Sequence, residues 1–140
     1  MRHYTILLAA CAGLALPAAA AAPVKMQTQL TGGAEVPGPG ADKGMGEATL
    51  TFDSDKAQVC YMLHSMGTDT PTMAHIHKGA AGVAGGVVVP LTAPADGKSD
   101  GCAPLAADAM ADIIAHPADY YVNVHTAAFP KGAIRGQLGK

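Results

Sequence analysis

Three histidines occupy positions from which they could bind a single metal ion. His75 and His77 lie two residues apart in segment 72–78, and His125 lies in a second apolar segment, 120–126. If both segments are β-strands, residues two apart share a face, and Ala74 and Ile76 take the opposite, inward face. Imidazole suits copper and zinc, and three such ligands leave one position open for water or a fourth ligand. The histidines therefore predict a copper or zinc site if these two strands are neighbours.

Three more polar side chains are predicted to stand around this cluster. Tyr121 and Asn123 alternate with valines and therefore share the outer face with His125. Arg135 lies outward in the last apolar segment, where it is expected to bond loop carbonyls or to neutralise an acid. All three are candidates to contact and orient the metal ligands without binding the metal themselves.

The same histidines have a second, structural interpretation. Residues 79–86 form a glycine-rich stretch directly after His77. This stretch lacks the Gly-Lys-Ser/Thr ending and the following helix of a phosphate-binding loop, so a hairpin loop is expected. The histidines could hold that loop by hydrogen bonds with no metal present, and the two interpretations both stay open.

Strands are the elements that must position these residues. Short segments alternate apolar with polar residues and are bounded by Gly, Pro, Asp or Asn, a pattern typical of half-buried strands. Seven strands are predicted, at residues 24–30, 47–53, 59–63, 72–78, 87–91, 120–126 and 133–138. This spacing predicts an all-β fold, an antiparallel Greek-key-like β-sandwich or barrel.

One helix is predicted between residues 104 and 115. Leu105, Ala109 and Ile113 lie on one side of it, and His116-Pro117 ends it. Such a short amphipathic helix is expected to cover one end or edge of the sandwich.

The first 22 residues are predicted to be a cleaved secretory signal peptide, which leaves residues 23–140 as one domain. A short basic start, an apolar run at 6–16 and small residues at 18–22 form this pattern, with cleavage within residues 18–23. The apolar run is shorter than the roughly 20 residues that span a bilayer. A periplasmic or secreted protein is expected, and a lipoprotein site at Cys11 is disfavoured by the short apolar core before it.

Composition excludes several classes of protein. The net charge is −2, and the chain has only four Tyr, two Phe and no Trp, so nothing predicts nucleic-acid binding. With 49% hydrophobic and 14% charged residues, the chain is not expected to be disordered. No transmembrane segment is predicted, and the sequence points to no particular protein partner or oligomeric state.

Two cysteines follow the predicted signal peptide, Cys60 and Cys102. In an exported protein an even pair is expected to form a disulfide rather than a metal or catalytic site.

Several long stretches resemble the chordin-type (CHRD) domain family. These are residues 74–82, 86–91, 120–126 and 129–138, and Glu35-Val36-Pro37 is similar to the opening of that domain. The resemblance covers essentially the whole predicted domain and implies a single-domain exported bacterial member. Such domains also occur in chordin, which binds growth factors, but this chain has none of chordin's cysteine-rich modules, so growth-factor binding does not carry over.

The histidine pattern is also similar to the copper half of Cu/Zn superoxide dismutase, another Greek-key β structure. The resemblance implies copper ligation by His75, His77 and His125 and a substrate-guiding role for Arg135. The chain has no residue matching the histidine that bridges the two metals. The loop after His77 also lacks the His and Asp ligands of a zinc subsite.

Three hypotheses follow for the function. The first is an exported, non-enzymatic CHRD-domain binding module that holds a transition metal, above all copper, through the outward histidines. The second is a structural or protein-interaction domain of the cell envelope with no metal. The third, a minor one, is a copper-only oxidoreductase similar to superoxide dismutase.

Overall fold

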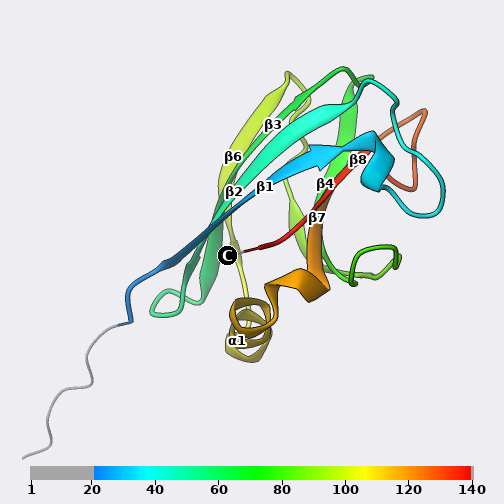
Figure 1. Ribbon diagram of the computed structural model, residues 1–140. Helices are drawn as coiled ribbons and strands as arrows, with labels where there is room; N and C mark the ends of the chain where they lie inside the picture. Colours follow the sequence, from blue (N-terminus) through cyan, green and yellow to red (C-terminus); the bar gives the residue numbers. More distant parts are fainter. Residues whose placement is uncertain (1–20, 140) are drawn as a thin grey trace, which may run out of the picture.

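The computed structural model describes residues 21–139, in which eight strands form one antiparallel sheet. The strand order is β5-β4-β7-β8-β1-β2-β3-β6. Figure 1 shows the sheet curling round until its two edge strands, β5 and β6, approach each other. There the Ser99 hydroxyl donates to the Thr92 carbonyl over 2.7 Å. The predicted all-β architecture is confirmed as a nearly closed barrel. The strands are β1 Val24–Thr31, β2 Met45–Asp53, β3 Gln58–Met66, β4 Pro71–Lys78, β5 Gly86–Leu91, β6 Lys98–Pro104, β7 Tyr120–Thr126 and β8 Ile134–Gln137.

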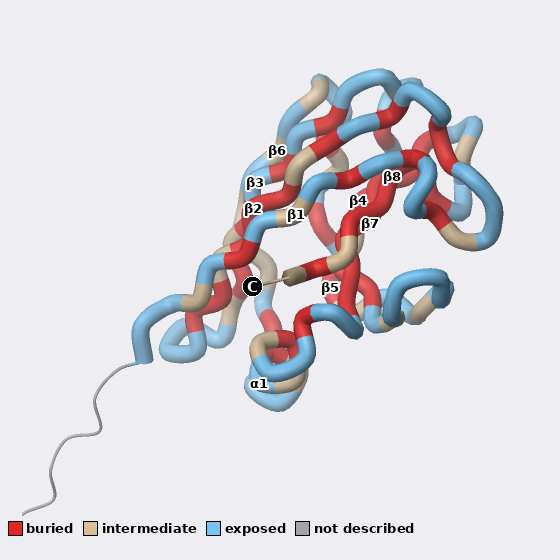
Figure 2. Tube along the Cα trace, viewed as in Figure 1, coloured by how far each residue is buried: buried red, intermediate tan, exposed pale blue. Residues whose placement is uncertain are grey.

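The barrel interior is filled by the alternating apolar residues of the strands. Leu50, Phe52 and Leu63 are almost completely buried, as their inward positions predicted. Burying one such side chain stabilises the fold by about 1.5–3 kcal/mol. Figure 2 shows buried residues alternating with more exposed ones along β1 and β3, whereas β7 is buried along its whole length. Something therefore covers the outer face of β7, and that cover forms the candidate site described below.

The prediction of seven strands missed β6. Its segment Lys98-Ser99-Asp100-Gly101 has a turn-like composition and no apolar residue that would indicate a strand face. The structure instead pairs β6 with β3 as an edge strand whose residues are exposed or half-buried in alternation. The pairing to β3, rather than local propensity, makes this segment a strand.

The predicted disulfide is present between β3 and β6. Cys60 and Cys102 lie directly opposite each other in the antiparallel register and are bonded. The bond ties the edge strand to its only hydrogen-bonded neighbour within the sheet.

Residues 21–139 contain one α-helix, α1 Ala107–Ala115, which lies at one end of the barrel, as expected (Figure 1). Its Met110 and Ile113 are buried against the core cluster. The helix ends before Pro117, which opens the 3₁₀ turn η2 Pro117–Asp119. On its outer side Asp112 accepts hydrogen bonds from the Lys78 ammonium at 2.6 Å and from the Tyr120 hydroxyl, which attach the helix to β4 and β7. A second 3₁₀ turn, η1 Gly32–Ala34, follows β1.

The predicted signal peptide, including Cys11, lies almost entirely outside the described residues. Among residues 21–139, no helix has the length and apolar character needed to cross a membrane.

Candidate metal centre

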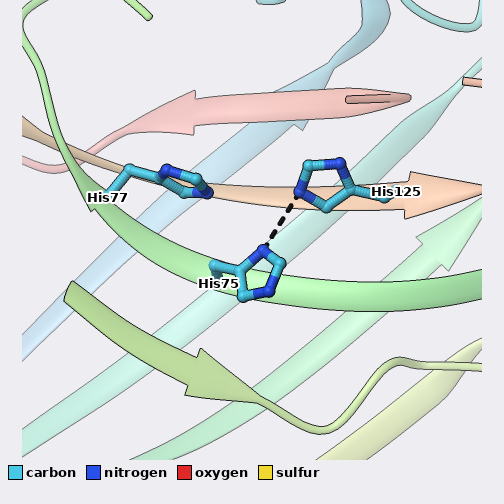
Figure 3. Close-up of side chains that lie close together, drawn as sticks. All are labelled: His75, His77 and His125. Carbon is cyan, nitrogen blue, oxygen red and sulfur yellow. Dashed lines mark hydrogen bonds between the residues drawn. The ribbon is translucent and has the colours of Figure 1, made fainter. Parts of the chain in front are cut away.

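The three histidines converge because β4 and β7 are neighbours. The register places Met73 opposite His125, His75 opposite Asn123 and His77 opposite Tyr121. The residues between the histidines on β4, Ala74 and Ile76, are fully buried in the core, so the imidazoles must leave the outer face. Figure 3 shows the three rings pointing toward one another. The neighbouring strands on which the predicted metal site depended are therefore present.

The ring nitrogens are close enough to form one cluster. His75 Nδ1 lies 3.1 Å from His125 Nε2. One nitrogen from each of the three rings lies within 4.8 Å of the other two. Nitrogens bound to one ion at about 2.0–2.1 Å span at most about 4 Å, so the rings must close by about 1 Å to hold a metal. His75, the least buried of the three, is the ring with room to move.

Backbone carbonyls fix which nitrogen of two of the rings carries a proton. His77 Nδ1 lies 3.0 Å from the Gly85 carbonyl, and His125 Nδ1 lies 3.1 Å from the Pro130 carbonyl. A carbonyl only accepts, so both Nδ1 atoms carry hydrogen and both Nε2 atoms present a lone pair. This is how ligating histidines are commonly oriented in metal sites, with the second nitrogen donating to a carbonyl or carboxylate.

Burial keeps all three imidazoles neutral near neutral pH. It lowers the pKa of His75 to about 4, helped by repulsion from His125 and His77. Burial also lowers the pKa of His77 and, with repulsion from His77, that of His125. A neutral imidazole is the form that binds a metal, so all three rings present a lone pair at neutral pH.

One wall of the site is the loop of residues 79–85 between β4 and β5. Its Gly85 carbonyl accepts from His77 Nδ1, and its Gly85 amide donates to the Tyr121 hydroxyl over 3.1 Å. The Tyr121 ring also stacks on the His77 ring, with centroids 4.8 Å apart and planes 4° from parallel. A β-carbon at position 85 would lie 1.6 Å from the Lys78 carbonyl oxygen, so only glycine fits there. The predicted hairpin loop is confirmed, and it is held over the histidines.

Arg135 binds this loop from β8. Its guanidinium donates to the carbonyls of Ala80 and Val83, each over 2.9 Å, and lies 3.4 Å from the centre of the Tyr121 ring. The side chain is only 1% exposed, although it stands on the outer face as predicted. Of the two roles expected for it from the strand pattern, hydrogen bonds to loop carbonyls are present, and its charge also acts on the buried acid Glu35.

A buried acid, Glu35, was not predicted as part of this region. It follows η1, is 7% exposed, and packs over Gly132 so closely that a β-carbon there would lie 2.3 Å from its Oε2. Gly132 belongs to a second loop, residues 127–133 between β7 and β8, whose Pro130 carbonyl accepts a hydrogen bond from His125 Nδ1. Burial raises the pKa of Glu35 to about 7, against the opposing pull of Arg135. Its only sequence signal was its place in the Glu-Val-Pro opening.

Two buried polar atoms within the cluster have no hydrogen-bond partner among the described residues. They are His77 Nε2 and the side-chain oxygen of Asn123, which is 2% exposed. Buried polar atoms are normally paired, and leaving one unpaired costs about 1–3 kcal/mol. These two acceptor atoms, together with the other two imidazoles, form a donor set of the kind that a cation binds.

The other two histidines of the described part of the chain lie away from the cluster. His116 follows α1 and bonds Asp112 over 3.0 Å. His64 is exposed on β3, on the far side of β8 and β1 from the cluster in strand order. Met73 is the one sulfur-bearing residue whose position, opposite His125 on the same face, is next to the cluster.

Comparison with known proteins addresses the family but not the metal. The sequence model of the CHRD domain matches residues 26–138, which include every strand of the barrel except the first two residues of β1. Searches of curated proteins and of solved structures found no match. The matched region also carries the three histidines, both covering loops and the disulfide. The chain belongs to the CHRD domain family.

Proposed function

We propose that this protein is an exported CHRD-domain module that binds one copper ion through His75, His77 and His125 and catalyses no reaction. The observation that carries the proposal is His77 Nε2, a buried nitrogen with a free lone pair and no partner, facing two other imidazoles. Export is supported by the signal-like N-terminal sequence and by the Cys60–Cys102 disulfide, since disulfides persist in oxidising compartments.

The donor set favours copper over the alternatives. The cluster offers three neutral imidazoles and no carboxylate or thiolate, which suits Cu(II) and Zn(II) better than magnesium or calcium. Between the two, a given nitrogen site binds Cu(II) more tightly. When bound, the ion would take His77 Nε2 and His125 Nε2. His75 would supply Nδ1, because that atom already faces His125 Nε2 at 3.1 Å.

Binding requires one proton to change place. In the metal-free cluster His125 Nε2 accepts a hydrogen bond, so His75 Nδ1 must be the donor. To ligate through Nδ1, His75 must move its proton to Nε2, while the other two rings already have the required tautomer. Because all three rings are neutral, copper binding near pH 7 should release almost no protons.

Copper titration by calorimetry and electron paramagnetic resonance tests this proposal on the protein purified without a histidine tag. One equivalent of Cu(II) should bind, with hyperfine structure from nitrogen ligands. His75→Ala should weaken binding at least tenfold, and it removes no bond to either loop. His116→Ala is the matched control, because that ring bonds only Asp112 on α1, and it should leave affinity unchanged. No binding by the wild-type protein, or equal binding by His75→Ala, would refute the proposal.

A second candidate function is a metal-free structural or protein-interaction domain, and the loop contacts favour it. His77, Tyr121 and Arg135 all bond the 79–85 loop, so the same side chains could serve only to fix that surface. The two functions differ in what His75 does, since it bonds no loop residue. Under the structural function, His75→Ala changes neither metal content nor the loop. His77→Ala then lowers the free energy of unfolding equally with and without added copper.

A further inference from the structure

A second group of metal-binding side chains lies on the outer face of β2 and β3. Met45 and Met66 are 56% and 62% exposed, although methionine usually fills gaps in a core. His64 shares their face on β3 and is also exposed. Packing therefore does not explain the choice of these side chains, which makes a ligand-binding role worth testing.

The strand register brings these residues together. Met45 pairs directly with Met66 across β2 and β3, and the next pair on the same face is Glu47 with His64. Side chains on directly opposite residues have β-carbons about 4.5–5.5 Å apart. All four residues line one open hollow of about 480 Å³, with Gln29 and Gly46 completing it. Two thioethers and one imidazole thus face a common space from two rigid strands.

The carboxylate in this hollow is already oriented. Gln27 and Gln29 on β1 donate to the two oxygens of Glu47, each over 3.2 Å. Among the described residues no side-chain hydrogen bond holds the His64 ring, so its nitrogens are available to a ligand. Glu47 adds a negative charge beside the sulfurs, which favours a cation over an anion.

We infer that Met45, Met66 and His64 form a binding site for a soft monovalent cation, Cu(I) or its analogue Ag(I). Thioether sulfur selects Cu(I) among biological metals, and one imidazole completes a three-coordinate set. The site differs from the three-histidine cluster in its strands, its donors and its exposure. It therefore does not depend on the function proposed for that cluster.

Silver titration of the protein labelled with ¹³C at the methionine methyl groups tests this inference. Ag(I) replaces Cu(I) because it resists oxidation and takes the same ligands. It is added as nitrate in chloride-free buffer. The methyl signals of Met45 and Met66 should shift together and saturate at one equivalent. Met73, opposite His125, reports silver bound at the histidine cluster instead, so the two sites are read separately in one spectrum.

Variants assign the ligands. Met45→Leu/Met66→Leu keeps the volume of each side chain but removes sulfur, and it should weaken silver binding at least tenfold. Met62→Leu is the matched control, since Met62 is 51% exposed on the same face of β3 but does not line the hollow. His75→Ala should leave the shifts of Met45 and Met66 intact. The inference fails if all exposed methionines shift at the same silver concentration, or if the double variant binds as tightly as the wild type.

Discussion

Replacing Gly85 by alanine should detach the 79–85 loop from the histidine cluster. The new β-carbon would lie 1.6 Å from the Lys78 carbonyl oxygen, a backbone atom that cannot move without displacing the end of β4. The Gly85 backbone must therefore shift. Its bonds to His77 Nδ1 and to the Tyr121 hydroxyl then break.

The expected loss of stability follows from those two bonds. A hydrogen bond between neutral groups contributes about 0.5–1.5 kcal/mol, so Gly85→Ala should lower the free energy of unfolding by about 1–3 kcal/mol. Gly86→Ala is the matched control, because no atom lies within 4 Å of a β-carbon built there. That variant should stay within about 0.5 kcal/mol of the wild type. Urea denaturation followed by circular dichroism measures both variants.

The same pair of variants tests how the loop acts on the metal ligands. Removing the group that orients a ligating histidine typically weakens metal binding by about 10–100-fold. Gly85→Ala should therefore bind Cu(II) about 10–100-fold more weakly, whereas Gly86→Ala should bind it as the wild type does. If the two alanine variants unfold at the same urea concentration, the loop is not held as described and the reasoning is wrong.

Three further predictions concern pH and the disulfide. Burial lowers the pKa of the clustered histidines below 6.5, to about 4 for His75. As the pH falls, these histidines therefore take up protons at a higher pH in the unfolded chain than in the folded chain. The free energy of unfolding should fall as the pH drops from 6.5 toward 4, and His75→Ala should reduce that fall in urea titrations. The contribution of Glu35 to the free energy of unfolding changes with pH in the opposite direction, because burial raises its pKa from 4.5 to about 7. Its stabilising contribution is complete below pH 4.5 and is lost as the pH rises through 7. Glu35→Gln should therefore exceed the wild type in stability by roughly 1–2 kcal/mol above neutral pH, after allowance for solvent screening, and match it near pH 4. The Cys60–Cys102 bond spans 42 residues, and the chain-entropy model gives a stabilisation of about 4 kcal/mol. Cys60→Ser/Cys102→Ser should lose that amount, and mass spectrometry that finds two free thiols in the purified protein would contradict the bond.

The histidine cluster was predictable because strand alternation is a local property of the sequence. Ala74 and Ile76 on β4 indicate which way His75 and His77 point, and the structure has all four residues on the predicted faces. A one-residue shift would have reversed every one of them. The sequence did not predict that β4 pairs with β7, because about 40 residues separate the two strands. Neither segment contains a local pattern that identifies such a distant partner.

The cover over the cluster was less predictable. The side chains were predicted to lie on the outer faces of β4 and β7, but their degree of burial was not predicted, and His77, His125 and Asn123 are all nearly buried there. The loops of residues 79–85 and 127–133 cause this burial. Both contact the sheet through backbone carbonyls, and because every residue type has a carbonyl, the sequence gives no sign of these contacts. The burial of Glu35 was not predictable either, because it depends on contact with Gly132, a residue about 100 positions later in the chain.

The placement of the cluster on the outer face follows from how the barrel is filled. The interior is occupied by apolar side chains, so no site with three polar ligands fits there without leaving donors unpaired. The outer face carries the polar side chains of each strand, but an imidazole exposed to water there would be hydrated and would take up a proton at a higher pH. The two loops exclude that water, and Arg135 and Tyr121 hold one of them in place. The core packing of Ala74, Ile76 and the β7 valines therefore sets which atoms point outward, while the loops set how deeply those atoms are buried.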